Sequence, residues 1–220
     1  MRKKIILELL LVTVIAIVAA RICFFLGFLP VFKNFSGTIF AVIFIYVPVL
    51  VLWLKKRRID FLDDRASDYW RSVKYFLVIS TIIFPLFILV AHFWQTIVMG
   101  RSFVGFSLPQ HIFTIIAYNV LLVALPEEFF FRGYFQSTLK SVSVPKWRIL
   151  GADLGWWWPI TAAVFALSHS LVTFQWWHFS IFFPALVFGW LRERTGSITS
   201  PVLFHALSNV MMAIFLGWYR

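Results

Sequence analysis

Charged residues and cysteine are scarce in this sequence. The single cysteine, Cys23, cannot form an intramolecular disulfide, which excludes a fold held together by disulfides within the chain. Charged residues make up 13% of the chain, about half the share usual in soluble domains. Apolar residues reach 61%, with a mean hydropathy of +0.88. A chain with this composition has apolar residues for its outside as well as its inside, so it is predicted to be a polytopic membrane protein.

Long apolar stretches run through the whole chain and predict an all-α transmembrane helical bundle. A helix needs about 20 mostly apolar residues to cross the hydrocarbon core of a bilayer. By this measure we predict about seven membrane-spanning helices, or eight if residues 139–155 also dip into the membrane. The seven spans are expected near residues 5–29, 36–54, 75–98, 112–136, 156–171, 176–191 and 199–218.

The net charge of +11 indicates membrane orientation and does not indicate nucleic-acid binding. Of the 20 Lys and Arg residues, 15 fall on the side of the N-terminus and four on the other side, with Arg132 set aside as intramembrane. Seven of the 15 belong to the loop 55–74. Basic loops stay in the cytoplasm, which predicts a cytoplasmic N-terminus. The first apolar run reaches Pro30, longer than the core of a signal peptide, and is therefore expected to be a retained span.

Two of the nine acidic residues lie deep inside a predicted span. They are Glu127 and Glu128, in the segment LPEEFFFRGYFQ. An ionisable group within a span is costly and indicates a functional site. Glu128 and Arg132 are four residues apart and share a helical face, so they are expected to pair. Glu127 points about 100° away and needs another partner.

Two of the five histidines occur in segments that suggest chemistry. His169 ends the segment FALSH, and His205 begins HALSN, in which Asn209 follows one helical turn later on the same face. The other three histidines are expected at the membrane interface: His92, His111 and His178.

A carboxylate, two imidazoles and an amide in a dry pocket suit the hydrolysis of a bond by activated water. A desolvated carboxylate can act as the base, and an imidazole with an amide N–H can stabilise an oxyanion. Zinc remains an alternative, since Glu127, His169 and His205 could form an open three-ligand site. We favour a metal-free site, because a ligand role for His205 would leave Asn209 without a function.

The motifs EEFFFR, FALSH and HALSN occur in this order on successive predicted helices. This ordered set resembles the CAAX protease and bacteriocin-processing (CPBP or ABI) family, which contains the type II CAAX prenyl endopeptidases. The resemblance covers roughly residues 112–215. It implies a glutamic-type intramembrane endopeptidase without a metal cofactor, with residues 111–220 as the catalytic core and residues 1–110 as N-terminal transmembrane helices.

The resemblance also implies roles for single residues. Glu127 and His169 are expected to activate water, and His205 and Asn209 to stabilise the oxyanion. Glu128 and Arg132 are expected to support them.

The implied partner is a membrane-anchored protein or peptide in the lipid bilayer, with no nucleic acid involved. Family members trim prenylated CAAX tails, process bacteriocins or cleave C-terminal sorting tails. For this chain we favour a sorting tail of the kind that myxosortase-like members cleave, although the predicted depth of the motifs suits a CAAX-type substrate slightly better. The short loops suggest a prokaryotic protein of the cytoplasmic membrane. A rival hypothesis is a proton-coupled transporter or membrane scaffold that uses Glu127, Glu128 and Arg132 as a relay or lock. Transporters commonly contain internal repeats, and none is evident here.

Overall fold

The computed structural model describes residues 2–220 of the chain and shows a bundle of α-helices with one small β-hairpin. The all-α class predicted from composition is therefore confirmed. The helices before residue 100 are α1 (Arg2–Leu26), α2 (Ser36–Leu54) and α3 (Ala66–Phe93), which continues as a π-helical turn, η1 (Trp94–Val98).

One 29-residue helix, Ile112–Lys140, carries the acidic pair. It alternates between α- and π-helical geometry, and π-helical turns are frequent at functional sites. Pro126, which lacks a backbone donor, lies directly before the two glutamates and between the two π-helical segments. The successive segments are α4 (Ile112–Tyr118), η2 (Asn119–Ala124), α5 (Leu125–Glu128), η3 (Phe129–Gln136) and α6 (Ser137–Lys140).

The chain after residue 140 forms a hairpin and three further helices. The antiparallel hairpin pairs Trp147 with Leu154, and all three residues of its first strand are exposed. The elements are β1 (Trp147–Ile149), β2 (Ala152–Leu154), α7 (Trp157–Thr173), a 3₁₀ turn η4 (Trp176–Ile181), α8 (Phe182–Thr195) and α9 (Thr199–Leu216). The alternative of an eighth helical span over residues 139–155 is therefore wrong. A two-stranded hairpin has unpaired backbone groups at its edges, which lipid could not satisfy.

Five helices of the described chain are long and apolar enough to cross a membrane. The chain is thus a multi-pass membrane protein, but the helices at two of the seven expected spans, 156–171 and 176–191, are not among these five. At 1.5 Å per residue, α7 is about 26 Å long and α8 about 21 Å, against a hydrocarbon core of about 30 Å. The expected span 176–191 is divided between η4 and α8. The third expected span begins earlier, at Ala66, so part of the predicted loop 55–74 is helical.

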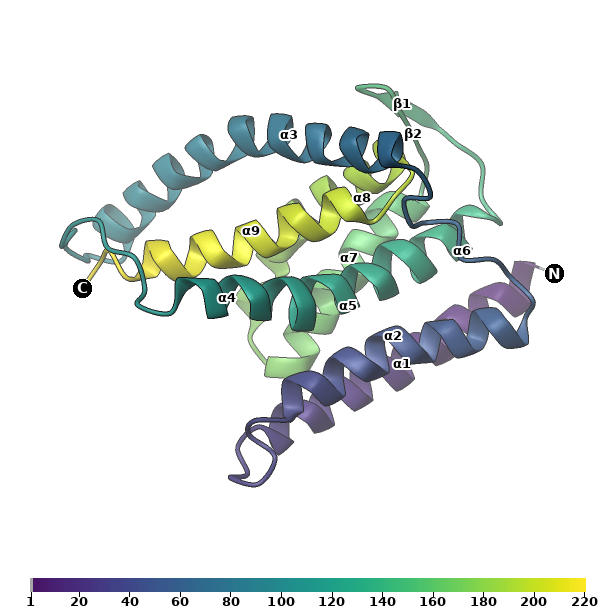
Figure 1. Cartoon of the computed structure of the whole chain (residues 1–220), viewed down its shortest axis with the longest axis horizontal. Coiled ribbons are helices and arrows are strands. Elements are labelled where there is room, and N and C mark those ends of the chain that lie inside the picture. Colours follow the sequence, from purple (N-terminus) through teal and green to yellow (C-terminus); the bar gives the residue numbers. More distant parts are fainter. Residues whose placement is uncertain (1) are drawn as a thin grey trace.

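The helices are arranged so that the basic connections lie together. Figure 1 shows the N-terminus, the segment after α2, the hairpin after α6 and the α8–α9 connection at one end of the molecule. A hydrogen bond of 2.9 Å from the Ile198 amide to the Phe61 carbonyl joins two of these segments. Next to them, Arg71 of α3 donates to the carbonyl oxygen of Thr195, the last residue of α8, at 2.5 Å. The basic segments expected to share one side of the membrane are therefore on one side of the fold; that this side is cytoplasmic stays a prediction.

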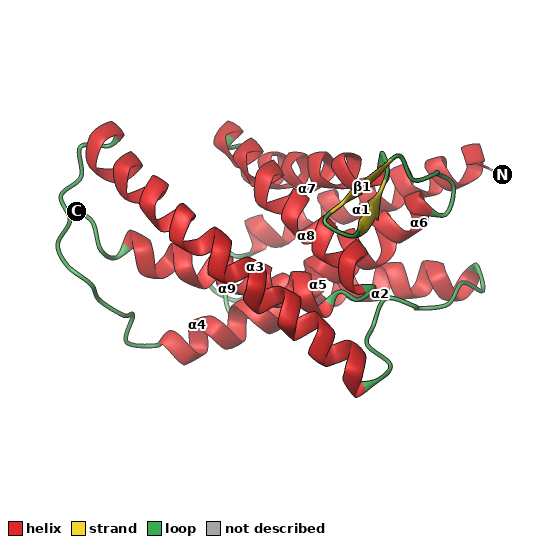
Figure 2. Ribbon diagram, turned by 90° about the horizontal axis from the view of Figure 1, so that it is seen from above, coloured by secondary structure: helices red, strands yellow, loops and turns green. Residues whose placement is uncertain are grey.

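The segments α5 and η3 of the central helix lie in the middle of the bundle and hold the acidic pair there. Figure 2 shows α3 lying across α9, and these two helices are in contact. α1 pairs with α2 at one flank of the bundle, where α1 contacts α7 and α2 contacts η2, α5 and η3. Every residue of η3 is buried. The acidic pair is thus surrounded by helices from both halves of the chain.

The segment between α2 and α3 is fixed to the central helix by Phe61. Its ring is 1% exposed and packs edge-on against Phe129 at 5.0 Å. Directly behind this ring lies Gly133, where an added Cβ would be 2.5 Å from a ring carbon of Phe61. Glycine at this position lets the segment approach the helix that carries the acidic pair.

Gly133→Ala is expected to lower the free energy of unfolding by about 1–2 kcal/mol. Alanine gains up to about 1 kcal/mol of helix propensity, but overpacking a buried site typically costs about 1–3 kcal/mol, and the buried Phe61 ring has little room to move. Unfolding in mixed detergent micelles, followed by tryptophan fluorescence, measures the change. The double variant Gly133→Ala/Phe61→Leu should lose less than the sum of the single variants. A Gly133→Ala variant as stable as the parent would contradict this packing.

Candidate active site

The two adjacent glutamates on α5 have different surroundings. Glu128 is completely buried, and Glu127 is 7% exposed. The expected pair is present, with Arg132 Nη1 donating to Glu128 Oε1 at 2.8 Å. Arg132 Nη2 donates to the carbonyl oxygen of Ala185 on α8 at 3.0 Å. Glu128 and Arg132 thus tie the central helix to α8.

Aromatic rings surround the guanidinium of Arg132. Its Cζ lies 4.4 Å from the ring centre of Phe165 and 4.9 Å from that of Phe188. Cation–π contacts of this kind are stronger where water is excluded. The two rings stabilise the charge of Arg132 beside Glu128, at a place that solvent does not reach.

His205 on α9 connects the two glutamates. Its Nδ1 is 2.9 Å from Glu128 Oε1, and its Nε2 is 3.9 Å from Glu127 Oε2. An ionised carboxylate can only accept a hydrogen bond, so pairing with ionised Glu128 assigns a proton to Nδ1. The ring stacks on Phe188 at 4.9 Å with an interplanar angle of 17°. His205 is therefore fixed with its second nitrogen on the side of Glu127.

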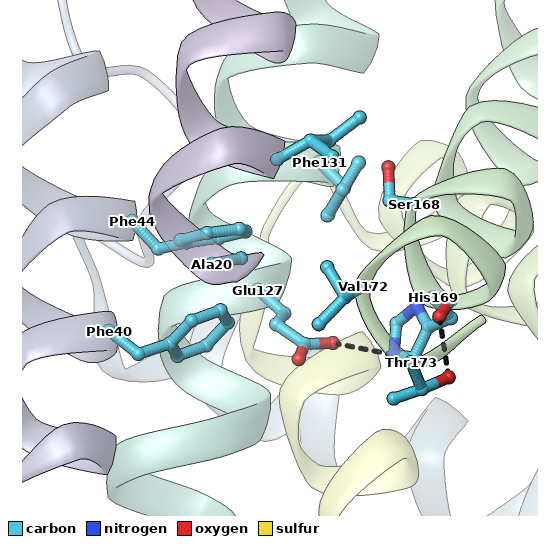
Figure 3. Close-up of a pocket in the computed structure, with 10 residues that line it drawn as sticks. Ala20, Phe40, Phe44, Glu127, Phe131, Ser168, His169, Val172 and Thr173 are labelled. Atoms are coloured by element: carbon cyan, nitrogen blue, oxygen red, sulfur yellow. Dashed lines mark hydrogen bonds and ion pairs between the residues drawn. The ribbon is translucent and has the colours of Figure 1, made fainter. Parts of the chain in front are cut away.

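His169 on α7 approaches Glu127 from another side. Its Nδ1 is 3.0 Å from the carbonyl oxygen of Phe165, which can only accept, so Nδ1 carries a proton. Its Nε2 lies 3.5 Å from Glu127 Oε2. Figure 3 shows the carboxylate and the imidazole facing one another. With His169 neutral and Glu127 ionised, both facing atoms are hydrogen-bond acceptors.

Glu127 Oε2 is buried and makes no hydrogen bond to any residue of the described chain. A buried polar atom without a partner is unfavourable and calls for water or a ligand. Oε2 and His169 Nε2, as two acceptors 3.5 Å apart, can each accept one hydrogen of the same water. Both hydrogens of that water would be held, and an oxygen lone pair would be left for attack.

The pocket beside Glu127 is almost wholly apolar and has an empty volume of about 400 Å³. Figure 3 shows Phe40 and Phe44 of α2 and Ala20 of α1 on the side of Glu127 away from His169. The first two helices therefore form part of the wall of the site. These residues could not be identified from the sequence, because an apolar residue inside an apolar span has no distinguishing signal.

Asn209 follows His205 on α9 by one turn and is half-buried. Its side chain makes no hydrogen bond to other residues within the described 2–220 range. The structure thus brings five of the six expected site residues into contact with one another and leaves Asn209 one turn away from His205 on the same helix. Its expected role stays a prediction.

His178 lies closer to the site than expected of an interfacial residue. Its Nδ1 is 2.9 Å from the hydroxyl of Thr173, which lines the pocket, and its ring centre is 6.4 Å from that of His169. Helix α7 ends at Thr173, and the left-handed residue Phe174 turns the chain so that η4 passes the site. Helical spacing could not reveal this proximity, because the helix stops between the two histidines.

Zinc was the alternative to a metal-free site. Between residues 2 and 220, no three His, Cys, Asp or Glu side chains are arranged to hold one metal ion. His205 directs Nδ1 to Glu128 and Nε2 to the side of Glu127 at 3.9 Å. A Glu127–His169–His205 ligand set is thus not preformed in this geometry.

The central and C-terminal part of the chain matches a known family. Residues 109–211, somewhat less than half of the chain, match the family described as type II CAAX prenyl endopeptidase, Rce1-like. Comparison with curated proteins and with solved structures gave no match. The family match favours a peptidase over the rival transporter or scaffold. The chain therefore contains, over residues 109–211, a domain similar to the Rce1-like type II CAAX prenyl endopeptidases, which are membrane peptidases.

Proposed function

We propose that this protein is an intramembrane endopeptidase that hydrolyses a peptide bond of a membrane-anchored protein or peptide with water activated by Glu127 and His169. The observation that carries the proposal is the pair of facing acceptors, Glu127 Oε2 and His169 Nε2, 3.5 Å apart beside an apolar pocket. Two such acceptors orient one water, and a carboxylate shielded from bulk solvent is a competent general base.

The reaction begins when Glu127 takes a proton from this water. The water oxygen then bonds to the carbonyl carbon of the substrate and forms a tetrahedral intermediate. The proton held by Glu127 passes to the amide nitrogen, the C–N bond breaks, and a carboxyl group and an amine leave. His169 accepts a hydrogen bond from the second hydrogen of the water. This keeps a lone pair of the water oxygen directed at the carbonyl carbon.

His205 supplies the charge that the intermediate needs. Its doubly protonated form donates from Nδ1 to Glu128 and from Nε2 to the developing oxyanion, as oxyanion-stabilising groups do in acyl transfer. The charges of Glu127, Glu128, Arg132 and His205 then sum to zero, which suits a buried cluster. Asn209, one turn further on α9, is proposed as a second donor to the oxyanion.

The pocket suits a substrate segment with apolar side chains that reaches Glu127 through the bilayer. It lies between α1, α2 and α7, and its wall includes Ile17, Phe40 and Val172. A prenylated CAAX tail and a C-terminal sorting tail both meet this description. We place the CAAX-type tail first, because the catalytic domain matches the CAAX prenyl endopeptidase family.

The purified full chain in lipid nanodiscs is expected to cleave a farnesylated CAAX peptide. In water enriched in ¹⁸O, mass spectrometry should find one ¹⁸O in the new carboxyl group of the farnesylcysteine, because water is the nucleophile. The rate should be unchanged after treatment with a chelator. A membrane-anchored sorting-tail peptide serves as the second substrate.

Three results would contradict parts of this proposal. If the folded protein cleaves neither peptide, the assigned function is wrong. Cleavage of the sorting tail alone would reverse the order of the two substrates. Loss of activity on chelation, with recovery on adding zinc, would show that a metal takes part.

A further inference from the structure

A second hollow lies away from the active site, between the start of α1 and the end of α2. This open groove has an empty volume of about 1300 Å³. Both helix ends lie at the end of the molecule where the basic segments gather (Figure 1). This end is therefore where the bundle meets the lipid headgroups, on whichever side of the membrane it faces.

The groove is apolar along its length and cationic at its rim. Its cationic residues are Lys4, Lys55 and Arg57, and its single acid is Glu8. The apolar part consists of Ile5, Leu7, Leu11, Val12, Val51 and Leu54. Leu7 and Leu11 are 67% and 60% exposed, so the groove opens sideways toward the acyl chains of the bilayer. A long apolar strip that ends in fixed positive charge matches an amphiphile with an anionic head.

Two of the three cations are free to bind a ligand. Arg57 is committed to Glu8, and Glu8 also accepts a hydrogen bond from the hydroxyl of Tyr134 at 2.9 Å. Lys4 and Lys55 form no ion pair or hydrogen bond through their ammonium groups with any described side chain or backbone atom. The acid of the groove is thus neutralised within the protein, while two ammonium groups remain.

The backbone at the end of α2 is shaped to direct basic residues into this groove. The Lys56 amide donates to the Trp53 carbonyl and the Arg57 amide to the Leu52 carbonyl, at 3.0 and 2.9 Å. This is the Schellman pattern of helix termination, in which the left-handed position is usually glycine. Here it is Lys56, with φ of 53°, although a left-handed conformation costs a non-glycine residue about 1–2 kcal/mol. The turn brings the Arg57 side chain back to Glu8.

We infer that this groove binds an anionic phospholipid, whose phosphate lies between Lys4 and Lys55 and whose acyl chain follows the strip formed by Leu7, Leu11 and Leu54. A free phosphate ion would use the charge but not the strip. A zwitterionic lipid would bring the positive charge of its own headgroup to the rim, where Lys4 and Lys55 would repel it. The ion pair of Arg57 with Glu8 forms the base of the site and fixes α1 against the segment that follows α2.

The test compares two charge-matched double variants of the full chain. Lys4→Gln/Lys55→Gln removes the two free ammonium groups of the groove. Lys3→Gln/Lys56→Gln removes two neighbouring charges that do not line it. Each protein is titrated with phosphatidylglycerol in micelles, and native mass spectrometry counts the retained lipids. Removal of two lysines near a lipid surface should weaken binding roughly 30-fold, at about 1 kcal/mol for each lysine.

The expected result is that Lys4→Gln/Lys55→Gln loses the tightly bound lipid and Lys3→Gln/Lys56→Gln keeps it. Phosphatidylcholine should be retained poorly by all three proteins, and inorganic phosphate should not compete. Equal loss in both double variants would overturn the inference, since it would show general attraction to the basic end. Equal retention of phosphatidylcholine, or competition by inorganic phosphate, would also overturn it. Unfolding temperatures of the three proteins identify any loss caused by misfolding.

Discussion

Glu127→Gln is expected to reduce peptide hydrolysis by about two to four orders of magnitude, the contribution usual for a general base. The glutamine amide has nearly the shape of the carboxylate but cannot take a proton from water. The measurement is single-turnover cleavage of the farnesylated peptide in nanodiscs, which separates chemistry from product release.

The stability of the same variant distinguishes a catalytic role from a structural one. Glu127 Oε2 has no hydrogen-bond partner in the described chain, so its buried charge receives little compensation from direct contacts. Replacing it by a neutral amide should leave the unfolding temperature unchanged or raise it, since strained functional groups commonly reduce stability. A variant that is both inactive and strongly destabilised would indicate that Glu127 supports the fold.

Asp153→Asn provides the matched control for this substitution. Asp153 is an exposed carboxylate within the same family domain, on the hairpin, and its nearest cation is Arg148 at 3.8 Å. The Asp153→Asn variant should cleave the peptide within about twofold of the parental rate, because surface ion pairs contribute little. If the Glu127→Gln variant cleaved the peptide at the parental rate, Glu127 would have no role in the chemistry.

Local features of the site could be read from the sequence. The pairing of Glu128 with Arg132 follows from a spacing of four residues on a helix, and the structure contains that pair. His169 and His205 could be selected because a polar residue inside a lipid-facing run is rare. Such predictions depend only on periodicity and on the cost of burying charge, both of which are properties of one helix.

Features that depend on several helices could not be read in this way. The apolar wall of the pocket, with Phe40 and Phe44, depends on how α1 and α2 pack against the central helix. The proximity of His178 depends on where α7 ends. Neither α7 nor α8 is long enough to cross the hydrocarbon core by itself, for a related reason. A helix that contacts protein neighbours within a bundle does not need the length that a lipid-facing span requires.

Removal of the charge of Arg132 is expected to have a large effect on the stability of the fold. Its guanidinium and the Glu128 carboxylate are both completely buried and bonded at 2.8 Å. Arg132→Met is expected to lower the free energy of unfolding by about 3–5 kcal/mol, because Glu128 keeps a buried charge whose main partner is gone. Unfolding in mixed micelles measures the loss, and cleavage should fall as well, since Glu128 positions His205.

Removing both charges tests whether the loss arises from the pair itself. Glu128→Gln alone leaves Arg132 unpaired except for its backbone bond to Ala185 and its aromatic neighbours, so it should also destabilise the fold. The double variant Arg132→Met/Glu128→Gln buries no unpaired charge and should recover much of the stability, as replaced buried ion pairs often do. Recovered stability without recovered cleavage is expected, because His205 would lose the Glu128 carboxylate that positions it through Nδ1. If the two single losses simply added, the pair would not be coupled, and Arg132 would contribute to stability mainly through packing.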